Sequence, residues 1–577
     1  MSLLSYGKVD EFGQERLEAR RKTRKRIAII AVSTIVLIGI IVGAAVGATR
    51  GGKTKSDGDP AAGLTSTSSL SESIKAICNL TLHPNSCYTS LSSAINNDTS
   101  HINPEQIFKL SVEVALSELS KVAENFMEDL GGINDKAFVA ALGNCKELLG
   151  LALDHLNTTM SDGNSSLIDA VDDLRTWLSA AGTYQQTCID GFQNVTQEIW
   201  YVASQHLNNS TQYTSNSLAI ITGISNLVSS FKLRRLMSYE DCDHGFPDWA
   251  SRRSRELKQM FDTPVSKVKA DVVVAKDGSG NYKTITAALK AVPEKSKKRF
   301  VIYVKKGVYY ENVRVEKSTW NVTMIGDGMN ATIVSGSLNF VDGTPTFSTA
   351  TFAVFGKGFF ARDMGFQNTA GPAKHQAVAL MASADECVFY RCYIDAFQDT
   401  LYAHAQRQFF KECIVRGTVD FIFGNAAVIL QNCSILPKVP MPGQQNTITA
   451  QGKTDPNQNT GIVIQNCTIS PFGNLSSVAT YLGRPWKPYS TTLYMRSWMN
   501  GFIHPAGWLP WNGTTAPDTI FYSEFENFGP GSLMKYRVKW KGLKNITVKQ
   551  ASKFTVKAFL KGEKWISNAG FKYASNL

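Results

Sequence analysis

The sequence predicts a multidomain protein with three parts: an N-terminal transmembrane anchor, an all-α four-helix bundle, and an all-β, right-handed parallel β-helix. Residues 27–48 form an uncharged apolar run. Residues 70–231 carry apolar side chains at helical spacing, and from residue 265 onward short β-rich runs repeat about every 20 residues. A chain of 577 residues is also too long for one compact core, so several folded units are expected.

The apolar run from Ile27 to Ala48 has the length that spans a bilayer. Six basic residues stand directly before it: Arg20, Arg21, Lys22, Arg24, Lys25 and Arg26. By the positive-inside rule, residues 1–26 form a cytoplasmic tail and everything after Arg50 lies outside. An uncleaved signal anchor is favoured over a cleaved signal peptide, because the apolar core of a signal peptide is normally shorter.

Residues 49–69 form a linker rich in Gly, Ser and Thr, and residues 70–231 are predicted to form the helical bundle. Apolar residues recur there every three to five positions, as at Ile107, Leu110, Val114 and Leu119. This segment also holds four cysteines, a close pair at Cys78 and Cys87 and a distant pair at Cys145 and Cys188.

The cysteine layout, with Cys188 at the end of Tyr-Gln-Gln-Thr-Cys, resembles the plant invertase and pectin methylesterase inhibitor family. The resemblance covers the whole segment 70–231 and implies an inhibitor-like pro-domain. Residues 232–264 are a second linker, with a dibasic pair in Lys232-Leu-Arg-Arg-Leu-Met-Ser. A dibasic pair between domains is a protease site or a plain basic linker. Arg234–Met237 also resembles the processing motif of two-domain pectin methylesterase precursors, which implies a subtilisin-like processing protease as a partner.

In the β-rich segment 265–577, four copies of one template place a cysteine after a polar residue and before a short β-prone stretch. These are Cys392, Cys413, Cys433 and Cys467, which are 21, 20 and 34 residues apart. One turn of about 20 residues, stacked on the last, is what a parallel β-helix needs, and the longer step leaves room for an inserted loop. A β-sandwich is the alternative, but it gives no reason for cysteines in register.

Two segments of the chain carry opposite net charges, and this difference narrows the classes of ligand that the basic segment could bind. Residues 238–577 carry 40 basic and 25 acidic side chains, a net of +15, whereas residues 70–230 carry 6 and 17, a net of −11. The sequence has no nucleic-acid-binding motif, so an acidic polymer is a better partner for the basic half than a nucleic acid.

Unusual polar groups stand among aromatic residues in three blocks of the β-rich segment. Asp399 and Asp420 are 21 residues apart, one predicted turn, which places their strands about 4.8 Å from each other. Carboxylates that share a site have pKa values pushed apart, so one can act as a nucleophile while the other donates a proton. Gln376 and Gln398 are amide donors suited to an oxyanion, and Arg484 could pair with an ionised aspartate. Flat faces on which sugar rings can stack come from Trp486, Phe421 and Tyr402.

These blocks, with Gly307-Val-Tyr309-Tyr-Glu311 upstream, closely resemble the pectin methylesterase family from Asp271 to Phe571. The resemblance implies that Asp420 is the nucleophile, that Asp399 is the proton donor and later the base, and that Gln398 and Gln376 stabilise the oxyanion. It implies sugar contacts for four residues: Thr346, Gln376, Arg484 and Trp486.

The same resemblance implies removal of methyl esters from pectin, with methanol as the second product and with no cofactor and no metal. The implied partners are pectin, the processing protease and separate inhibitor proteins. The precursor is then expected in secretory membranes and the mature enzyme in the cell wall.

Two alternatives are a pectin lyase or polygalacturonase with the same β-helix, and an inhibitor that carries an inactive enzyme domain. The paired glutamines favour an ester reaction, since a glycosidic reaction uses two carboxylates across the bond that is cleaved. Disulfide candidates include Cys413, Cys433 and Cys467, because Cys433 could pair with either neighbour. Cys242 and Cys387 could be free or could pair with each other.

Overall fold

The computed structural model describes residues 66–95, 103–129, 135–161, 167–193, 195–236, 269–566 and 571–577. The chain divides into two compact units, Met1–Asn103 and Pro104–Leu577. The second unit contains both a group of long helices and the complete column of strands.

The predicted fold class is wrong in including a membrane anchor. Within the part of the chain that the structure describes, no helix is both long enough and apolar enough to cross a bilayer. The segment Ile27–Ala48, where the anchor was expected, lies outside the described residues.

The first unit contributes two short helices, α2 (Ser66–Cys78) and α3 (Pro84–Ala94). Pro84 opens α3 at a position where the missing amide hydrogen costs no helical bond. The disulfide between Cys78 and Cys87 joins the end of α2 to α3, and the hydroxyls of Ser71 and Tyr88 lie 2.8 Å apart. The close pair of cysteines therefore closes a helical hairpin.

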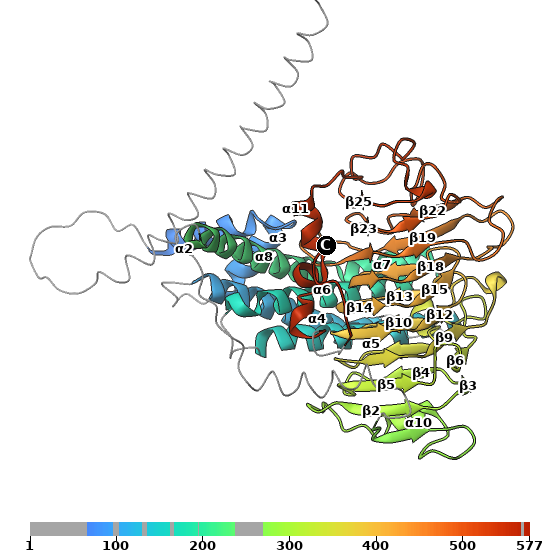
Figure 1. Ribbon diagram of the computed structural model, residues 1–577. Coiled ribbons are helices and arrows are strands. Elements are labelled where there is room, and N and C mark those ends of the chain that lie inside the picture. Colours follow the sequence, from blue (N-terminus) through green and yellow to red (C-terminus); the bar gives the residue numbers. More distant parts are fainter. Residues whose placement is uncertain are drawn as a thin grey trace, which may run out of the picture. The chain divides into compact units, whose positions relative to one another are not determined.

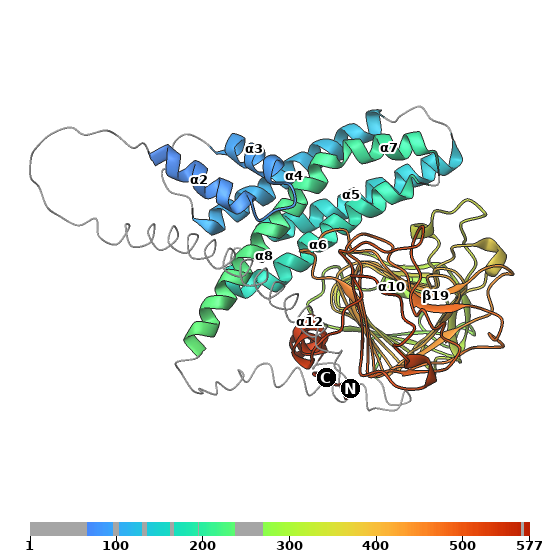
Figure 2. The same ribbon diagram turned by 90° about the horizontal axis from the view of Figure 1, so that it is seen from above.

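Five helices open the second unit: α4 (Pro104–Asp129), α5 (Lys136–Ser161), α6 (Leu167–Gly191), α7 (Gln197–His206) and α8 (Asn208–Leu236). The long helices α4, α5, α6 and α8 pack side by side (Figure 2), with α5 and α8 each in contact with both α4 and α6. Apolar residues at helical spacing bury one face of α5, and the disulfide Cys145–Cys188 joins α5 to α6. Helix α8 continues through Arg234 and Arg235, so the chain is still helical where the second linker was expected to begin.

The strands form a column of three parallel sheets (Figure 1). The first sheet contains β1 (Val272–Val274), β2 (Phe300–Val304), β5 (Val322–Gly326), β8 (Phe360–Arg362), β11 (Cys387–Tyr390), β14 (Arg407–Lys411), β17 (Ala427–Gln431), β20 (Gly461–Gln465), β23 (Thr491–Met495) and β25 (Phe521–Phe525). The second contains β3 (Gly307–Tyr310), β6 (Thr332–Gly336), β9 (Gly365–Asn368), β12 (Tyr393–Asp395), β15 (Ile414–Gly417), β18 (Ser434–Pro437), β21 (Thr468–Ile469) and β24 (Trp498–Met499). The third contains β4 (Val313–Val315), β7 (Phe352–Val354), β10 (Leu380–Ala382), β13 (Leu401–Ala403), β16 (Ile422–Gly424), β19 (Asn446–Gln451) and β22 (Thr480–Gly483).

Each central coil of this column places one strand in each sheet, so residues of successive coils lie in register. Val388 pairs with Phe409, Phe409 with Ile429, and Ile429 with Val463. Alternate side chains fill the inside of the coil with apolar groups, and a view along the column shows the sheets enclosing this core (Figure 2). On the outer side of the first sheet, these paired residues pack against the C-terminal helices, which include α12 (Val556–Phe559).

The repeated cysteines mark the corner between the first and second sheets. The residue before each one has a positive φ: 49° at Arg391, 54° at Glu412, 54° at Asn432 and 53° at Asn466. This left-handed conformation turns the chain out of one sheet and into the next, and asparagine adopts it more readily than most residues. The polar position of the repeat is therefore the corner of each coil.

The cysteines at this corner point into the core as thiols. Cys413, Cys433 and Cys467 were candidates for disulfides, but the structure leaves all three free, together with Cys387 and Cys392. The amide of Cys413 donates to the sulfur of Cys433 at 3.4 Å, and the amide of Cys433 donates to the sulfur of Cys467 at 3.3 Å. The sulfurs of Cys433 and Cys467 thus each accept a hydrogen bond from the coil before, in a single column of side chains. Cys242 lies outside the described residues.

Candidate active site

Asp399 and Asp420 lie on adjacent coils, as their spacing predicted. Leu401 of β13 pairs with Ile422 of β16, and each aspartate stands two residues before its partner in that pair. The backbone φ is 64° at Asp399 and 51° at Asp420, and both side chains are buried. Left-handed backbone at a residue other than glycine costs roughly 1–2 kcal/mol, and such strain concentrates at functional sites.

Asp420 is held by two charged or polar neighbours. Arg484 donates from Nε to Oδ1 at 2.9 Å and from Nη2 to Oδ2 at 2.7 Å, a two-pronged ion pair. Thr447 of β19 donates its hydroxyl to Oδ1 at 2.6 Å and accepts the amide of Asp420 at 2.9 Å. These bonds hold the carboxylate in place and fix its direction. The arginine was a sequence-predicted partner of an aspartate, whereas Thr447 was not recognised.

Asp399 is in the opposite electrostatic situation. Burial, followed by the negative charge of Asp420, raises the pKa of the Asp399 carboxyl well above its usual range, and Arg484 only partly opposes this. A carboxyl with a raised pKa keeps its proton to a higher pH than an ordinary carboxyl and can donate it. The two aspartates are therefore suited to different tasks, one as a nucleophile and the other as an acid.

Both aspartates open onto a cavity of about 360 Å³. Gln376, Gln398, Thr346, Tyr402, Arg484 and Trp486 also line it, so the structure brings these predicted residues together. Gln398 directly precedes Asp399, and the Gln376 block lies one coil earlier, before β10. The two amides thus share the cavity with the carboxyls, where they can donate to an oxyanion. In the described part of the chain, no group of histidine, cysteine or acidic side chains could hold a metal ion.

One predicted sugar-stacking residue lies elsewhere. Phe421 is 0% exposed and belongs to the apolar core of the β-helix, so it offers no face to a substrate. Phe423, two residues further along, lines the cavity instead and stacks on Tyr402, with ring centroids 4.2 Å apart. Trp511 was also missed. It lies 6.4 Å from Trp486 between centroids, and the Arg484 guanidinium lies 4.3 Å from its ring centroid.

Helices α5 and α6 supply the remaining wall of the cavity. The lining residues from this side include Ala141, Asn144 and Leu148 of α5, and Thr187 and Asp190 of α6. The Asn144 amide oxygen accepts the hydroxyl of Ser348 at 2.8 Å, and Asp190 pairs with Lys487 at 2.6 Å. A cavity with catalytic groups on one side thus has helices on the other.

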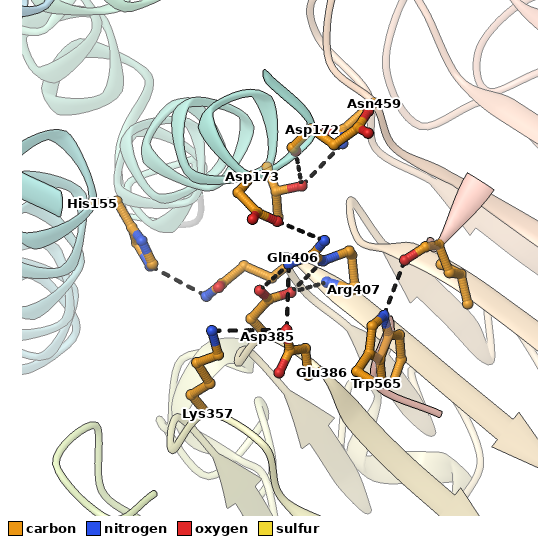
Figure 3. A network of polar contacts seen from close by, with 12 residues as sticks. His155, Asp172, Asp173, Lys357, Asp385, Glu386, Gln406, Arg407, Asn459 and Trp565 are labelled. Atoms are coloured by element: carbon orange, nitrogen blue, oxygen red, sulfur yellow. Dashed lines mark hydrogen bonds and ion pairs between the residues drawn. The ribbon is translucent and has the colours of Figure 1, made fainter. Parts of the chain in front are cut away.

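Beyond the cavity the same helices make a buried polar network with the β-helix (Figure 3). Arg407 lies between Asp385, at 2.6 Å, and Asp173 of α6, at 2.8 Å. Gln406 lies 3.2 Å from the Nε2 of His155 on α5. The contact between helices and β-helix is therefore built largely from charged and hydrogen-bonding side chains.

Two family models match the chain. The model described as Pectinesterase matches residues 271–563, and the model described as Plant invertase/pectin methylesterase inhibitor matches residues 72–220. The first match holds every catalytic candidate, and the second lies within the helical segment.

Relatives match over nearly the full length. The chain is 56% identical to "Probable pectinesterase/pectinesterase inhibitor 46" of Arabidopsis thaliana, over 97% of this chain and 98% of the relative. It is 47% identical to pectinesterase 3 of Phaseolus vulgaris, over 100% and 99%. Among solved structures, carrot pectin methylesterase is 52% identical, with a TM-score of 0.53 over 54% of this chain and 99% of that one.

Proposed function

This chain belongs to the pectinesterase family and removes methyl esters from pectin, and we propose that it does so through an acyl-enzyme formed on Asp420. Asp420 attacks the C6 carbonyl carbon of a methyl-esterified galacturonate unit. The carbonyl oxygen becomes an oxyanion, to which the amides of Gln376 and Gln398 donate hydrogen bonds. The intermediate then collapses, and the C–O bond to the methoxy group breaks. Asp399 gives its proton to that oxygen, and methanol leaves.

The second half of the reaction uses the same groups in reverse. Asp399, now ionised, takes a proton from a water molecule, whose oxygen attacks the acyl carbon. Collapse of the second intermediate releases Asp420 as a carboxylate and leaves the galacturonate acid. Arg484 and Thr447 hold Asp420 in one direction through both halves, since they bond to its carboxylate in the resting site.

The observation that carries this proposal is the different environment of two neighbouring carboxyls. One is paired with an arginine, and the other has its pKa raised by burial and by the first. A lyase and a glycosidase both cleave the bond between sugar units and form no acyl-enzyme. Release of methanol without new reducing ends separates the proposed reaction from both.

The first prediction tests the aspartates. Asp420→Ala should abolish methanol release, because the covalent route is lost, while the fold should be retained. Asp399→Ala should also be severe, and an ester with a better leaving group should partly restore its rate. Asp518→Ala, at an exposed ion pair with Lys541, is a matched control and should keep full activity. Near-parental turnover of Asp420→Ala on pectin would contradict the mechanism.

We also propose that the helical domain inhibits the enzyme while both remain in one chain. Residues of α5 and α6 wall the cavity opposite the catalytic groups, so a polysaccharide and these helices compete for the same space. Opposite net charges favour the contact, and a covalent link raises the effective concentration of the two parts. A separate inhibitor protein of the same family would compete for this surface.

Cleavage at Arg234–Met237 by a subtilisin-like protease would then release an active enzyme to the cell wall. The second prediction follows: purified full-length chain should be silent or weakly active, and the fragment Ser238–Leu577 should be active. Replacing Arg234 and Arg235 with Ala should hold full-length protein in the secretory pathway. Mature enzyme of normal size in the wall despite these substitutions would place cleavage elsewhere. If the full-length chain were as active as the fragment, the helices would serve in folding or targeting and not in inhibition.

A further inference from the structure

Lys487 is a cation at the rim of the catalytic cavity, and its only recorded ion-pair partner in the described chain comes from the helical domain. It follows Trp486, and its Nζ lies 5.1 Å from the centroid of that ring. The same Nζ lies 2.6 Å from Oδ1 of Asp190, a residue of α6 that lines the cavity. The ammonium group of Lys487 therefore lies beside a ring that lines the cavity.

This ion pair is more withdrawn from water than the pair of Lys317 with Asp154, which also joins a helix to the β-helix. The side chains of Lys487 and Asp190 are 14% and 11% exposed, against 60% and 51% for Lys317 and Asp154. Asp190 also accepts a hydrogen bond from the side chain of Gln186 at 2.9 Å, so its carboxylate is held in place. A partly desolvated charge pair with fixed geometry contributes more to the contact between the helices and the β-helix than an exposed pair does. Water and salt weaken the attraction in an exposed pair.

When the helical domain leaves, Lys487 loses this carboxylate and faces the substrate groove. The substrate carries either a neutral methyl ester or a free carboxylate on every sugar unit. Arg484, the cation that lines the cavity, already forms a two-pronged pair with Asp420. Lys487 is thus a cation beside the cavity that can meet a charge on the polymer.

We propose that Lys487 binds the free carboxylate of a galacturonate unit that neighbours the ester being cleaved, and that Asp190 occupies this site as its stand-in in the intact chain. The inference rests on the proposed acyl-enzyme function and adds a substrate preference to it. The ligand is a stretch of homogalacturonan that already carries free carboxylates. An ammonium group forms an ion pair with a carboxylate but only a weaker ion–dipole hydrogen bond with a neutral methyl ester, so partly de-esterified chains are preferred.

The fragment Ser238–Leu577 suits the test, because the apolar clusters of the β-helix contain only residues of that segment. The carrot enzyme also matches 54% of this chain over 99% of its own length. Three variants of the fragment are compared: Lys487→Gln, Lys487→Arg, and Lys541→Gln as an exposed control. Methanol release is measured on fully methyl-esterified and on partly de-esterified oligogalacturonides.

The expected result is a change in preference. Lys487→Gln should lose kcat/KM on the partly de-esterified substrate about tenfold more than on the fully esterified one, chiefly through KM. Lys487→Arg should keep most of the preference, and Lys541→Gln should match the parent. Added salt should reduce the preference of the parent towards that of Lys487→Gln, since it screens the charge pair. Equal losses on both substrates, or none, would overturn the proposal.

Failure of the acyl-enzyme function and failure of the carboxylate site give different results. A parent fragment that releases no methanol from either substrate would refute the acyl-enzyme function. An active parent with an unchanged preference in Lys487→Gln would refute only the carboxylate site. In the full-length chain, assayed on the fully esterified substrate where loss of the Lys487 charge costs least, Asp190→Asn and Lys487→Gln should each raise activity, and together no more than either alone, because both remove one contact. Additive effects would show that the two residues act apart.

Discussion

At the scale of single residues, Asp399 and Asp420 are identical side chains for which we propose opposite roles, and the neighbours of the two side chains differ accordingly. Arg484 and Thr447 bond to Asp420 and fix the direction of its carboxylate. Asp399 is buried beside that negative charge, so the pKa of its carboxyl is raised. One carboxyl is consequently ready to attack a carbonyl carbon, while the other is ready to protonate the group that leaves.

The third prediction concerns Gln398, whose amide shares the cavity with both aspartates. Gln398→Ala should lower kcat by roughly 10²–10³, the usual cost of losing one oxyanion donor. The donor acts on charge that develops only during the reaction, so KM should change less than kcat. Steady-state methanol release over a range of pectin concentrations measures both. A change in KM at constant kcat would instead make Gln398 a sugar-binding residue.

At the scale of elements, the end of α8 controls access to the proposed processing site. The helix includes Arg234 and Arg235 and ends at Leu236. A protease binds its substrate as an extended strand, so the last turns of α8 must open before cleavage. Such local opening near a helix end costs much less than global unfolding, and its cost depends on helix propensity.

The fourth prediction changes that propensity without touching the recognised residues. Ser229→Ala with Ser230→Ala should stabilise the helical end by ~1 kcal/mol and slow cleavage about fivefold, whereas glycine at both positions should accelerate it. The rate is followed by gel analysis of purified full-length chain with the protease. A synthetic peptide of residues 226–240 carrying the same alanines is the control and should be cut at the parental rate. Equal rates for all full-length variants would show that opening of α8 does not limit cleavage.

At the scale of the molecule, two histidines lie where the helices meet the β-helix. His404 is 1% exposed, and its ring nitrogens lie 2.9 Å from the hydroxyls of Ser383 and of Thr187 on α6. His155 of α5 stacks on Tyr184 and contacts Gln406, with Asp154, Lys317 and Asp385 as the charges nearby. Burial lowers the pKa of His404 to about 3 and that of His155 to about 4, from 6.5. Both rings are therefore neutral while the two parts are in contact.

The sign of the pH effect follows from these lowered values. Separation returns water to both rings, so the separated state binds more protons between about pH 6.5 and pH 4. The contact is fully stable above pH 6.5. It weakens as the pH falls below 6.5, by about 1.4 kcal/mol per unit for each histidine.

The fifth prediction is that acid relieves inhibition. In a full-length chain made uncleavable by Arg234→Ala and Arg235→Ala, activity relative to the fragment should rise between pH 7 and pH 5.5. The ratio to the fragment at the same pH removes the pH dependence of the chemistry itself. His155→Gln with His404→Gln should flatten the rise, and His206→Gln, at the end of α7, should leave it unchanged. A ratio independent of pH in the parent would contradict this account.

The sequence by itself determined the repeat, the chemistry and the division of charge. The spacing of 21 residues between Asp399 and Asp420 is a local count, and one coil per repeat converts it directly into adjacency. The cysteine column was equally visible as a repeat. The bonding of these cysteines could not be predicted from the repeat. Whether two aligned sulfurs form a disulfide or accept hydrogen bonds from amides depends on the corner geometry of each coil.

Tertiary structure alone decided which side chains face the cavity and what covers it. Phe421 and Phe423 are both aromatic and two residues apart, so alternation of side chains along a strand would place them on the same face. The chain turns between Asp420 and β16, however, and of these two residues only Phe423 reaches the cavity. Thr447 and Lys487 gain their partners from distant segments, and no local pattern marks such contacts. A one-dimensional repeat fixes what lies above and below each residue in the coil, whereas loops and packed helices bring together residues whose separation in sequence follows no period.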